Sequence, residues 1–202
     1  MDDIRTGWDV AYLVMHSAFD ELGAAATICR VGPLDPQTID PAESFFLAGK
    51  IMQARAGARR PLVKAVALFQ AGMESLINFW SSEHPEIQSK NGFVQRWERA
   101  FVVKGLPATF GDYASFYREV RNAVIHPDTP QRITTIDQLR FIRVHEGIKH
   151  GWNAFRRLAD AIGEPHDKDS WHIMCEAHGV PTDCPEQLYP DLMLLGRQLF
   201  NV

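Results

Sequence analysis

The spacing of apolar residues is the feature that most constrains the fold of this chain. Between residues 8 and 28, apolar side chains recur every three or four positions, which is the period of one buried helix face: Val10, Leu13, Val14, Ala18, Leu22 and Ala25. This period returns along most of the chain, whereas alternating Val, Ile and Thr runs joined by Asn-Gly turns are nearly absent. The sequence therefore predicts an all-α protein.

Helix-breaking residues divide the periodic stretches into separate helices. Asp40 and Pro41 form a start signal, Gly57 is expected to end that helix, and Pro61 is expected to open the next one. Thr135 resembles a helix cap, and Pro127 ends the helix before it. After the first helix, we expect helices over about 41–55, 61–83, 93–103, 112–126, 135–162, 170–178 and 186–200. We expect them to pack as a helical bundle around 61–83, 112–126 and 135–162, with a helix from the N-terminal part.

Length and composition set further bounds. The 202 residues correspond to about one domain, so we expect a single all-α domain over residues 1–202. With 46% hydrophobic and 23% charged residues, the chain is not a disordered, collagen-like or disulfide-scaffold protein. A net charge of −4 does not indicate a nucleic-acid binder at the level of the whole chain, although a local basic patch remains compatible with it.

The termini and cysteines indicate a soluble, cytoplasmic protein. The three cysteines (Cys29, Cys175 and Cys184) are few and odd in number, as is typical of reduced thiols. The N-terminal sequence MDDIRTGWDV lacks the apolar run of a signal peptide, and the C-terminal sequence carries no lipidation signal. We expect no stretch to supply the roughly 18 apolar residues that a membrane span needs, and therefore no membrane association.

Residues 117–127 (YREVRNAVIHP) carry the polar residues that most suggest chemistry. Arg121, Asn122 and His126 stand at the end of a predicted helix, directly before Pro127. On an ideal helix Asn122 and His126 lie about 40° apart, and Arg121 lies about 140° from His126. The core stripe of that helix is expected to be Tyr113, Tyr117, Val120 and Val124. We therefore expect the three polar residues on the flank or outside of the bundle.

These residue types suit cleavage of a phosphodiester without a metal. Arginine offers a planar fork of donors to phosphate, and histidine titrates near neutral pH and serves as a general acid or base. In RNA the 2′-OH is an internal nucleophile, and cations stabilise the charge that develops on the phosphate. A single helix supplies only one histidine. A symmetric dimer across this face would bring two Arg121 and two His126 side chains together.

At these residues the chain resembles the HEPN superfamily, whose motif is an arginine, a polar residue that is often asparagine, three variable residues and a histidine late in a bundle helix. The stretch AVALFQAGMESLINFWSS is similar to the first long helix of that family, and Glu74 matches its frequent acidic residue. The resemblance covers about residues 61–160. It implies a four-helix HEPN-like core there, with an N-terminal helical extension over 1–60 and C-terminal helices over 161–202.

The resemblance also implies a function. Many members are metal-independent endoribonucleases of toxin–antitoxin, abortive-infection and CRISPR-linked systems, and they commonly dimerise with the motif at the interface. RNA, a second copy of the chain and an antitoxin protein would then be the partners, with no cofactor and no metal. Arg121 would hold the scissile phosphate, His126 would be the acid–base group and Asn122 would support them. Arg118, Arg140 and Arg143 are candidate RNA-binding residues.

Two other hypotheses stay open at this point. Some HEPN proteins have lost activity or only bind nucleotides, so the chain fits a non-catalytic helical module in which His126 merely complements the helix dipole. His172, Cys175, His178 and Cys184 are zinc-ligand types within thirteen residues. On a helix, however, His172 and His178 are about 240° apart, which favours a short amphipathic helix over a metal site.

The basic residues Arg55, Arg59 and Arg60 fit a solvated helix junction.

Overall fold

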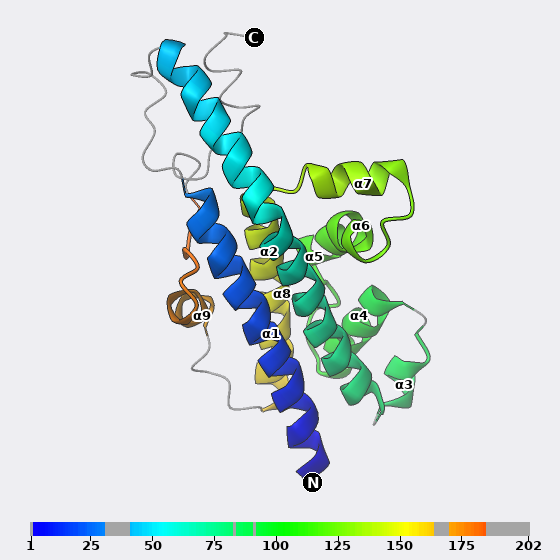
Figure 1. Ribbon diagram of the computed structural model, residues 1–202. Helices are drawn as coiled ribbons and strands as arrows, with labels where there is room; N and C mark the ends of the chain where they lie inside the picture. The colour runs from blue at the N-terminus through cyan, green and yellow to red at the C-terminus, as the bar shows by residue number, and fades with distance from the viewer. Residues whose placement is uncertain (1, 31–40, 83, 91, 164–169, 185–202) are drawn as a thin grey trace.

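The protein is described here from a computed structural model that covers residues 2–30, 41–82, 84–90, 92–163 and 170–184. Within these ranges it is all-α and contains no strand, as the helical period predicts (Figure 1). The helix predicted over 186–200 lies outside the described residues.

Two long helices, α1 (Asp2–Cys29) and α2 (Pro41–Ser82), run side by side in opposite directions (Figure 1). The buried face of α1 differs in part from the predicted one, because Val10 and Leu13 are 52% and 67% exposed. The face that packs on the bundle is instead Ala11, Met15, Ala18, Phe19, Leu22 and Ala25, all fully buried. Both sets have helical spacing, and only packing against neighbours distinguishes them.

α2 is one continuous helix, whereas the sequence predicted two helices separated at Gly57 and Pro61. A proline inside a helix costs about 3 kcal/mol because it removes a hydrogen bond and crowds the preceding turn. The apolar face of α2 continues through this point, with Leu47, Ile51, Ala58, Leu62 and Ala65 all buried. Burial on both sides of Pro61 therefore holds the two halves on one axis.

The helices after α2 are shorter and partly follow the predicted bounds. α4 (Phe93–Val103) and α9 (Trp171–Ala177) match their predictions closely, and α3 (Pro85–Gln88) falls in the predicted loop. The predicted helix over 112–126 is built from three pieces: α5 (Asp112–Phe116), the π-helical turn η1 (Tyr117–Arg121) and α6 (Asn122–Ile125).

The helix predicted over 135–162 is divided into α7 (Pro130–Asp137) and α8 (Phe141–Ile162). The cap of α7 is Thr129, whose hydroxyl accepts a hydrogen bond from the backbone N–H of Arg132 at 3.3 Å, and Pro130 follows at the first helical position. Thr135, the predicted cap, lies inside α7 and donates its hydroxyl hydrogen to the carbonyl oxygen of Gln131.

α8 passes very close to α2 and α5 at two glycines. A Cβ atom on Gly147 would lie 2.2 Å from the ring of Phe116, and one on Gly151 would lie 2.4 Å from the ring of Phe69. Glycine inside a helix is ordinarily destabilising, but at these two positions the missing side chain permits the close approach of the helices. Side chains buried on both sides of this contact join one hydrophobic core that α1 and α9 also enter.

The long helix α2 also contains the stretch Phe46–Ser82, which is long and apolar enough to cross a membrane by length and composition alone. Half of its most apolar window is buried inside the protein. That burial is consistent with the core helix of a soluble protein.

We expect Gly151→Ala to lower the free energy of unfolding by about 1–3 kcal/mol, because the added methyl group overlaps Phe69 and Tyr113. Gly49→Ala is the matched control, since a Cβ there meets nothing within 4 Å. It should stabilise the exposed helix by up to about 1 kcal/mol. Urea unfolding followed by circular dichroism measures both, and equal effects of the two changes would contradict the close packing of α8.

Candidate functional site

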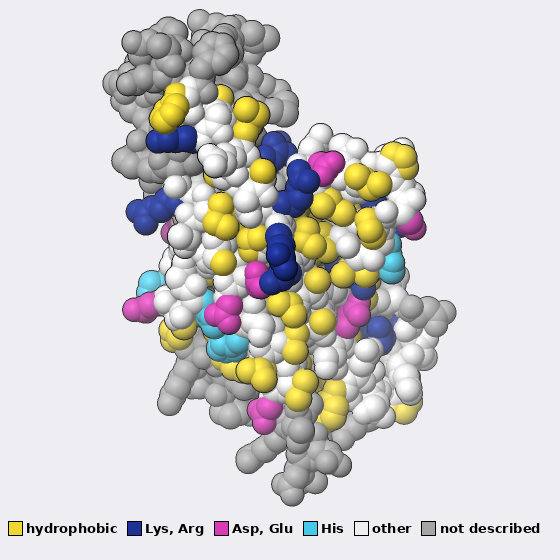
Figure 2. Space-filling model, in the orientation of Figure 1, with side chains coloured by type: hydrophobic (Ala, Val, Ile, Leu, Met, Phe, Trp, Pro, Cys, Tyr) yellow, Lys and Arg dark blue, Asp and Glu magenta, His cyan; other side chains and the backbone are white. Residues whose placement is uncertain are grey.

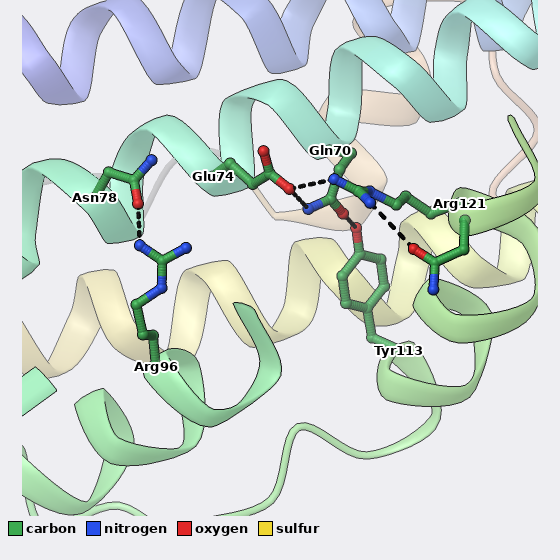
Figure 3. Close-up of polar contacts among 7 residues, drawn as sticks. Gln70, Glu74, Asn78, Arg96, Tyr113 and Arg121 are labelled. Carbon is green, nitrogen blue, oxygen red and sulfur yellow. Dashed lines mark hydrogen bonds and ion pairs between the residues drawn. The ribbon is translucent and has the colours of Figure 1, made fainter. Parts of the chain in front are cut away.

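A chain of polar side chains runs from the core to the Arg121 motif (Figure 3). The Tyr113 hydroxyl donates to Oε1 of Gln70 at 3.0 Å, and Nε2 of Gln70 donates to Oε1 of Glu74 at 2.9 Å. Nη2 of Arg121 donates to the same Glu74 oxygen at 2.5 Å, and Nη1 donates to Oδ1 of Asn122 at 3.0 Å. We call Tyr113, Gln70, Glu74 and Arg121 the polar chain; it joins α2, α5 and η1.

The helical positions of these residues account for the chain. Gln70 and Glu74 are four residues apart on α2, so they lie on the same face one turn from each other. Tyr113 and Gln70 are only 1% and 2% exposed, and buried polar groups of this kind need partners. Burial raises the pKa of the Tyr113 phenol above its ordinary value, so the hydroxyl stays protonated and remains a donor.

The π-helical turn places Arg121 differently from the ideal-helix expectation. A π turn contains one more residue than an α turn, so residues after Tyr117 are rotated relative to a regular helix. Ala123 is therefore buried, and Val124, predicted in the core stripe, is only partly so. Arg121 does not lie on the outer flank: its side chain is 12% exposed, and its guanidinium lies 4.9 Å from the Tyr117 ring centroid.

His126, unlike Arg121, has a solvent-exposed side chain. It is the C-cap of α6, with φ −129° and ψ 70°, and its ring is exposed to solvent. Its backbone is held, because its N–H donates to the Asn122 carbonyl at 3.0 Å and its own carbonyl accepts from Arg132 at 3.2 Å. Among the described residues, no hydrogen bond or ion pair joins the side chains of Arg121 and His126.

The three further candidate residues, Arg118, Arg140 and Arg143, are on η1 and at the start of α8. Arg118 is exposed on η1, and Arg140 is exposed at the start of α8. Arg143 forms an ion pair with Glu119 of η1 at 2.8 Å, between side chains that are 46% and 61% exposed. Other cations of α8 turn towards different neighbours, since Lys149 lies over Trp171 and Arg157 lies over Phe101. These three cations of α8 therefore have different neighbours.

The basic residues near Gly57 connect helices. Arg59 pairs with the carboxylate of Asp137 at 3.0 Å, and Arg55 donates to the carbonyl of the same residue at 3.4 Å. Lys64 pairs with Glu21 of α1 at 2.6 Å. These contacts fasten α7 and α1 to α2.

The zinc-ligand types near the C-terminus are separately engaged. His172 lies 3.3 Å from the Thr182 hydroxyl, and His178 contacts Asp20 and His16 of α1. Burial raises the pKa of Cys175 and of Cys184 to about 12, so both side chains are neutral thiols at neutral pH. Within the part of the chain that the structure describes, no three His, Cys, Asp or Glu side chains are placed to hold a metal ion.

Gln70 and Tyr113 are site residues that the sequence did not indicate, because Tyr113 was expected in the core stripe and Gln70 lies within a strongly apolar stretch. A signal was present in the form of a glutamine within a strongly apolar helix, followed four residues later by a glutamate. Comparison of the chain with protein families, with characterised proteins and with solved structures finds no match.

We expect Glu74→Gln to lower the free energy of unfolding by about 1–3 kcal/mol, because it leaves the mostly buried Arg121 without its charged acceptor. Glu119→Gln breaks the exposed pair with Arg143 and should cost no more than about 1 kcal/mol. Chemical denaturation of the two variants beside the wild type makes the comparison. A smaller loss in Glu74→Gln than in Glu119→Gln would show that the polar chain does not support the fold.

Proposed function

We propose that the protein is a HEPN-type, metal-independent endoribonuclease that acts as a homodimer in the cytoplasm. The observation that supports this most directly is the contrast within the motif. Arg121 is held by Glu74 and Asn122, whereas His126, five residues later, exposes its ring at a helix end. A fixed cation and an accessible imidazole are the two groups that attack by a 2′-OH on a phosphate requires.

The Arg121 guanidinium keeps donors for such a phosphate. Arginine has five N–H groups, and the contacts with Glu74 and Asn122 use one hydrogen on each Nη atom. The second hydrogen of each Nη is left for phosphate oxygens, and the bidentate geometry suits them. His126 would take the proton of the 2′-OH, and Asn122 would keep the guanidinium in its orientation.

The same part of the surface suits contact with a second copy of the chain. Ile125, one residue before His126, is 38% exposed, and Ile133, on the neighbouring α7, is 49% exposed. Figure 2 shows hydrophobic side chains gathered over α6 and α7. A twofold contact here would bring two His126 rings to one site and supply both an acid and a base. Under this proposal RNA is the substrate, and an antitoxin protein is the further partner.

One observation favours a second candidate, a non-catalytic binding module of the same type. Glu74 neutralises the charge of Arg121 at 2.5 Å, so each copy offers a phosphate less positive potential than the motif suggests. In this reading the polar chain stabilises the bundle, and the exposed face of α6 and α7 serves only for association.

Cleavage of a mixed-sequence RNA in the presence of EDTA tests the proposal. Wild type should cut and leave 2′,3′-cyclic phosphate ends, and His126→Ala should reduce the rate by about 10²-fold or more, because it removes the acid–base group. The exposed ring contributes little to the core, so the free energy of unfolding should change by less than about 0.5 kcal/mol.

His150→Ala is the matched control, since it removes another exposed histidine, on α8. It should cleave like wild type. Absence of cleavage by a folded, dimeric wild type would favour the binding module. Equal cleavage by wild type and His126→Ala would exclude His126 from the reaction.

A further inference from the structure

α2 carries a row of polar side chains that extends beyond the polar chain. Gln70, Glu74 and Asn78 are spaced four residues apart, so they lie on one face of the helix, each about 6 Å along its axis from the next. We call these three residues the α2 stripe. Exposure increases along it, since Gln70 is buried, Glu74 is partly exposed and Asn78 is exposed. The α2 stripe therefore passes from the core to the surface.

Two arginines reach the α2 stripe from other elements (Figure 3). Nη2 of Arg121, on η1, donates to Oε1 of Glu74 at 2.5 Å. Nη1 of Arg96, on α4, donates to Oδ1 of Asn78. Because Glu74 and Asn78 are one turn apart, the two guanidinium groups bind neighbouring turns of the same helix face.

A stack of side chains connects α4 with η1. The Phe93 ring lies 4.6 Å from the Tyr117 ring, at an angle of 12° between their planes, and the Arg121 guanidinium lies 4.9 Å from the Tyr117 centroid. Phe93 and Arg96 are three residues apart on α4, so they are neighbours on one face of that helix. This packing holds Arg96 beside the motif.

The two arginines differ in how their charge is compensated. Glu74 is a carboxylate and pairs with Arg121, whereas the amide oxygen of Asn78 accepts a hydrogen bond from Arg96 and carries no charge. Within the described part of the chain Arg96 forms no ion pair, and both hydrogens of its Nη2 are without an acceptor. Arg96 is partly exposed and therefore offers an uncompensated charge and two donors.

We propose that Arg96 is a phosphate-binding residue of the site and holds the RNA backbone next to the phosphate at Arg121. This inference rests on the proposed ribonuclease function and names a further cation that the substrate contacts. Guanidinium groups bind phosphate through paired donors. Pairing with Glu74 reduces the attraction that Arg121 exerts on a polyanion, and Arg96 supplies that attraction from the next turn of the α2 stripe.

Binding of a fluorescein-labelled, mixed-sequence, single-stranded 2′-O-methyl RNA to the full chain tests the assignment. This RNA lacks the 2′-OH nucleophile, so its affinity is measured separately from cleavage. Fluorescence anisotropy over a range of salt concentrations gives the Kd and its salt dependence. Arg96→Gln should raise the Kd about fivefold or more. It should also reduce the slope of log affinity against log salt by at least about 0.7, the value for one phosphate contact on a single strand. Arg96→Lys keeps the charge and should keep the slope.

A second variant leaves the arginine in place. Asn78→Asp changes an exposed residue and gives Arg96 a carboxylate partner, so it should weaken binding and reduce the salt slope in the same direction as Arg96→Gln. Lys50→Gln is the matched control for net charge. It removes one exposed cation of α2 about 40 Å along the helix from Asn78, and it should bind like wild type.

The two assays separate this inference from the proposed function. Unchanged affinity and salt slope in Arg96→Gln and Asn78→Asp would overturn the assignment of Arg96, as would an equal loss in Lys50→Gln or a wild type that does not bind the RNA. Cleavage of the unmodified RNA tests the ribonuclease function by itself. A wild type that binds through Arg96 without cutting would support the assignment and contradict the proposed reaction.

Discussion

Burial of the α2 helix is the constraint on which the rest of the structure depends. α1, α4, η1, α6, α7 and α8 all contact it. Its buried large side chains include Leu62, Phe69, Met73, Leu76 and Ile77. Each such side chain contributes about 1.5–3 kcal/mol when removed from water, so a few of them together exceed the cost of the internal proline, about 3 kcal/mol. The helix therefore continues through Pro61, and Gln70 is held in its buried part, with the partly exposed Glu74 one turn further on.

The polar chain follows from this position. A glutamine and a glutamate in the middle of a core helix need partners, and Tyr113 of α5 and Arg121 of η1 supply them. These hydrogen bonds form one connected series between α2, α5 and η1. The packing of the π-helical turn against α2 therefore determines where Arg121 lies. The geometry of the candidate site is thus determined by the core, although its histidine is on the surface.

The sequence was informative where structure depends on local spacing. Helical period predicted the all-α fold and the bounds of α4 and α9. It did not predict the continuity of α2, because burial on both sides of Pro61 outweighs the local breaking signal. It also misplaced the inner face of α1, since Val10 and Leu13 have the same spacing as the residues that are buried.

Local spacing was likewise insufficient to predict the geometry of the candidate site. The motif residues were visible in the sequence, and the resemblance pointed to Glu74, but the π turn that rotates Arg121 inward has no signature in an ideal-helix projection. The contact between His16 and His178 joins residues 162 positions apart, which no local pattern records. Interactions of this kind depend on which helices meet, and only the packed core determines that.

The charges around the motif bear on how an RNA substrate would be bound. Arg121 is paired with Glu74, Arg143 with Glu119, Arg132 with Asp128 and Arg59 with Asp137. These pairs largely cancel, and the whole chain carries a net charge of −4. Attraction of a polyanion depends on uncompensated charge, so one copy would bind RNA weakly. Two copies that face each other across α6 and α7 would double the few available cations within one site. Under the proposed function, catalysis would therefore depend more on dimerisation than the motif alone suggests.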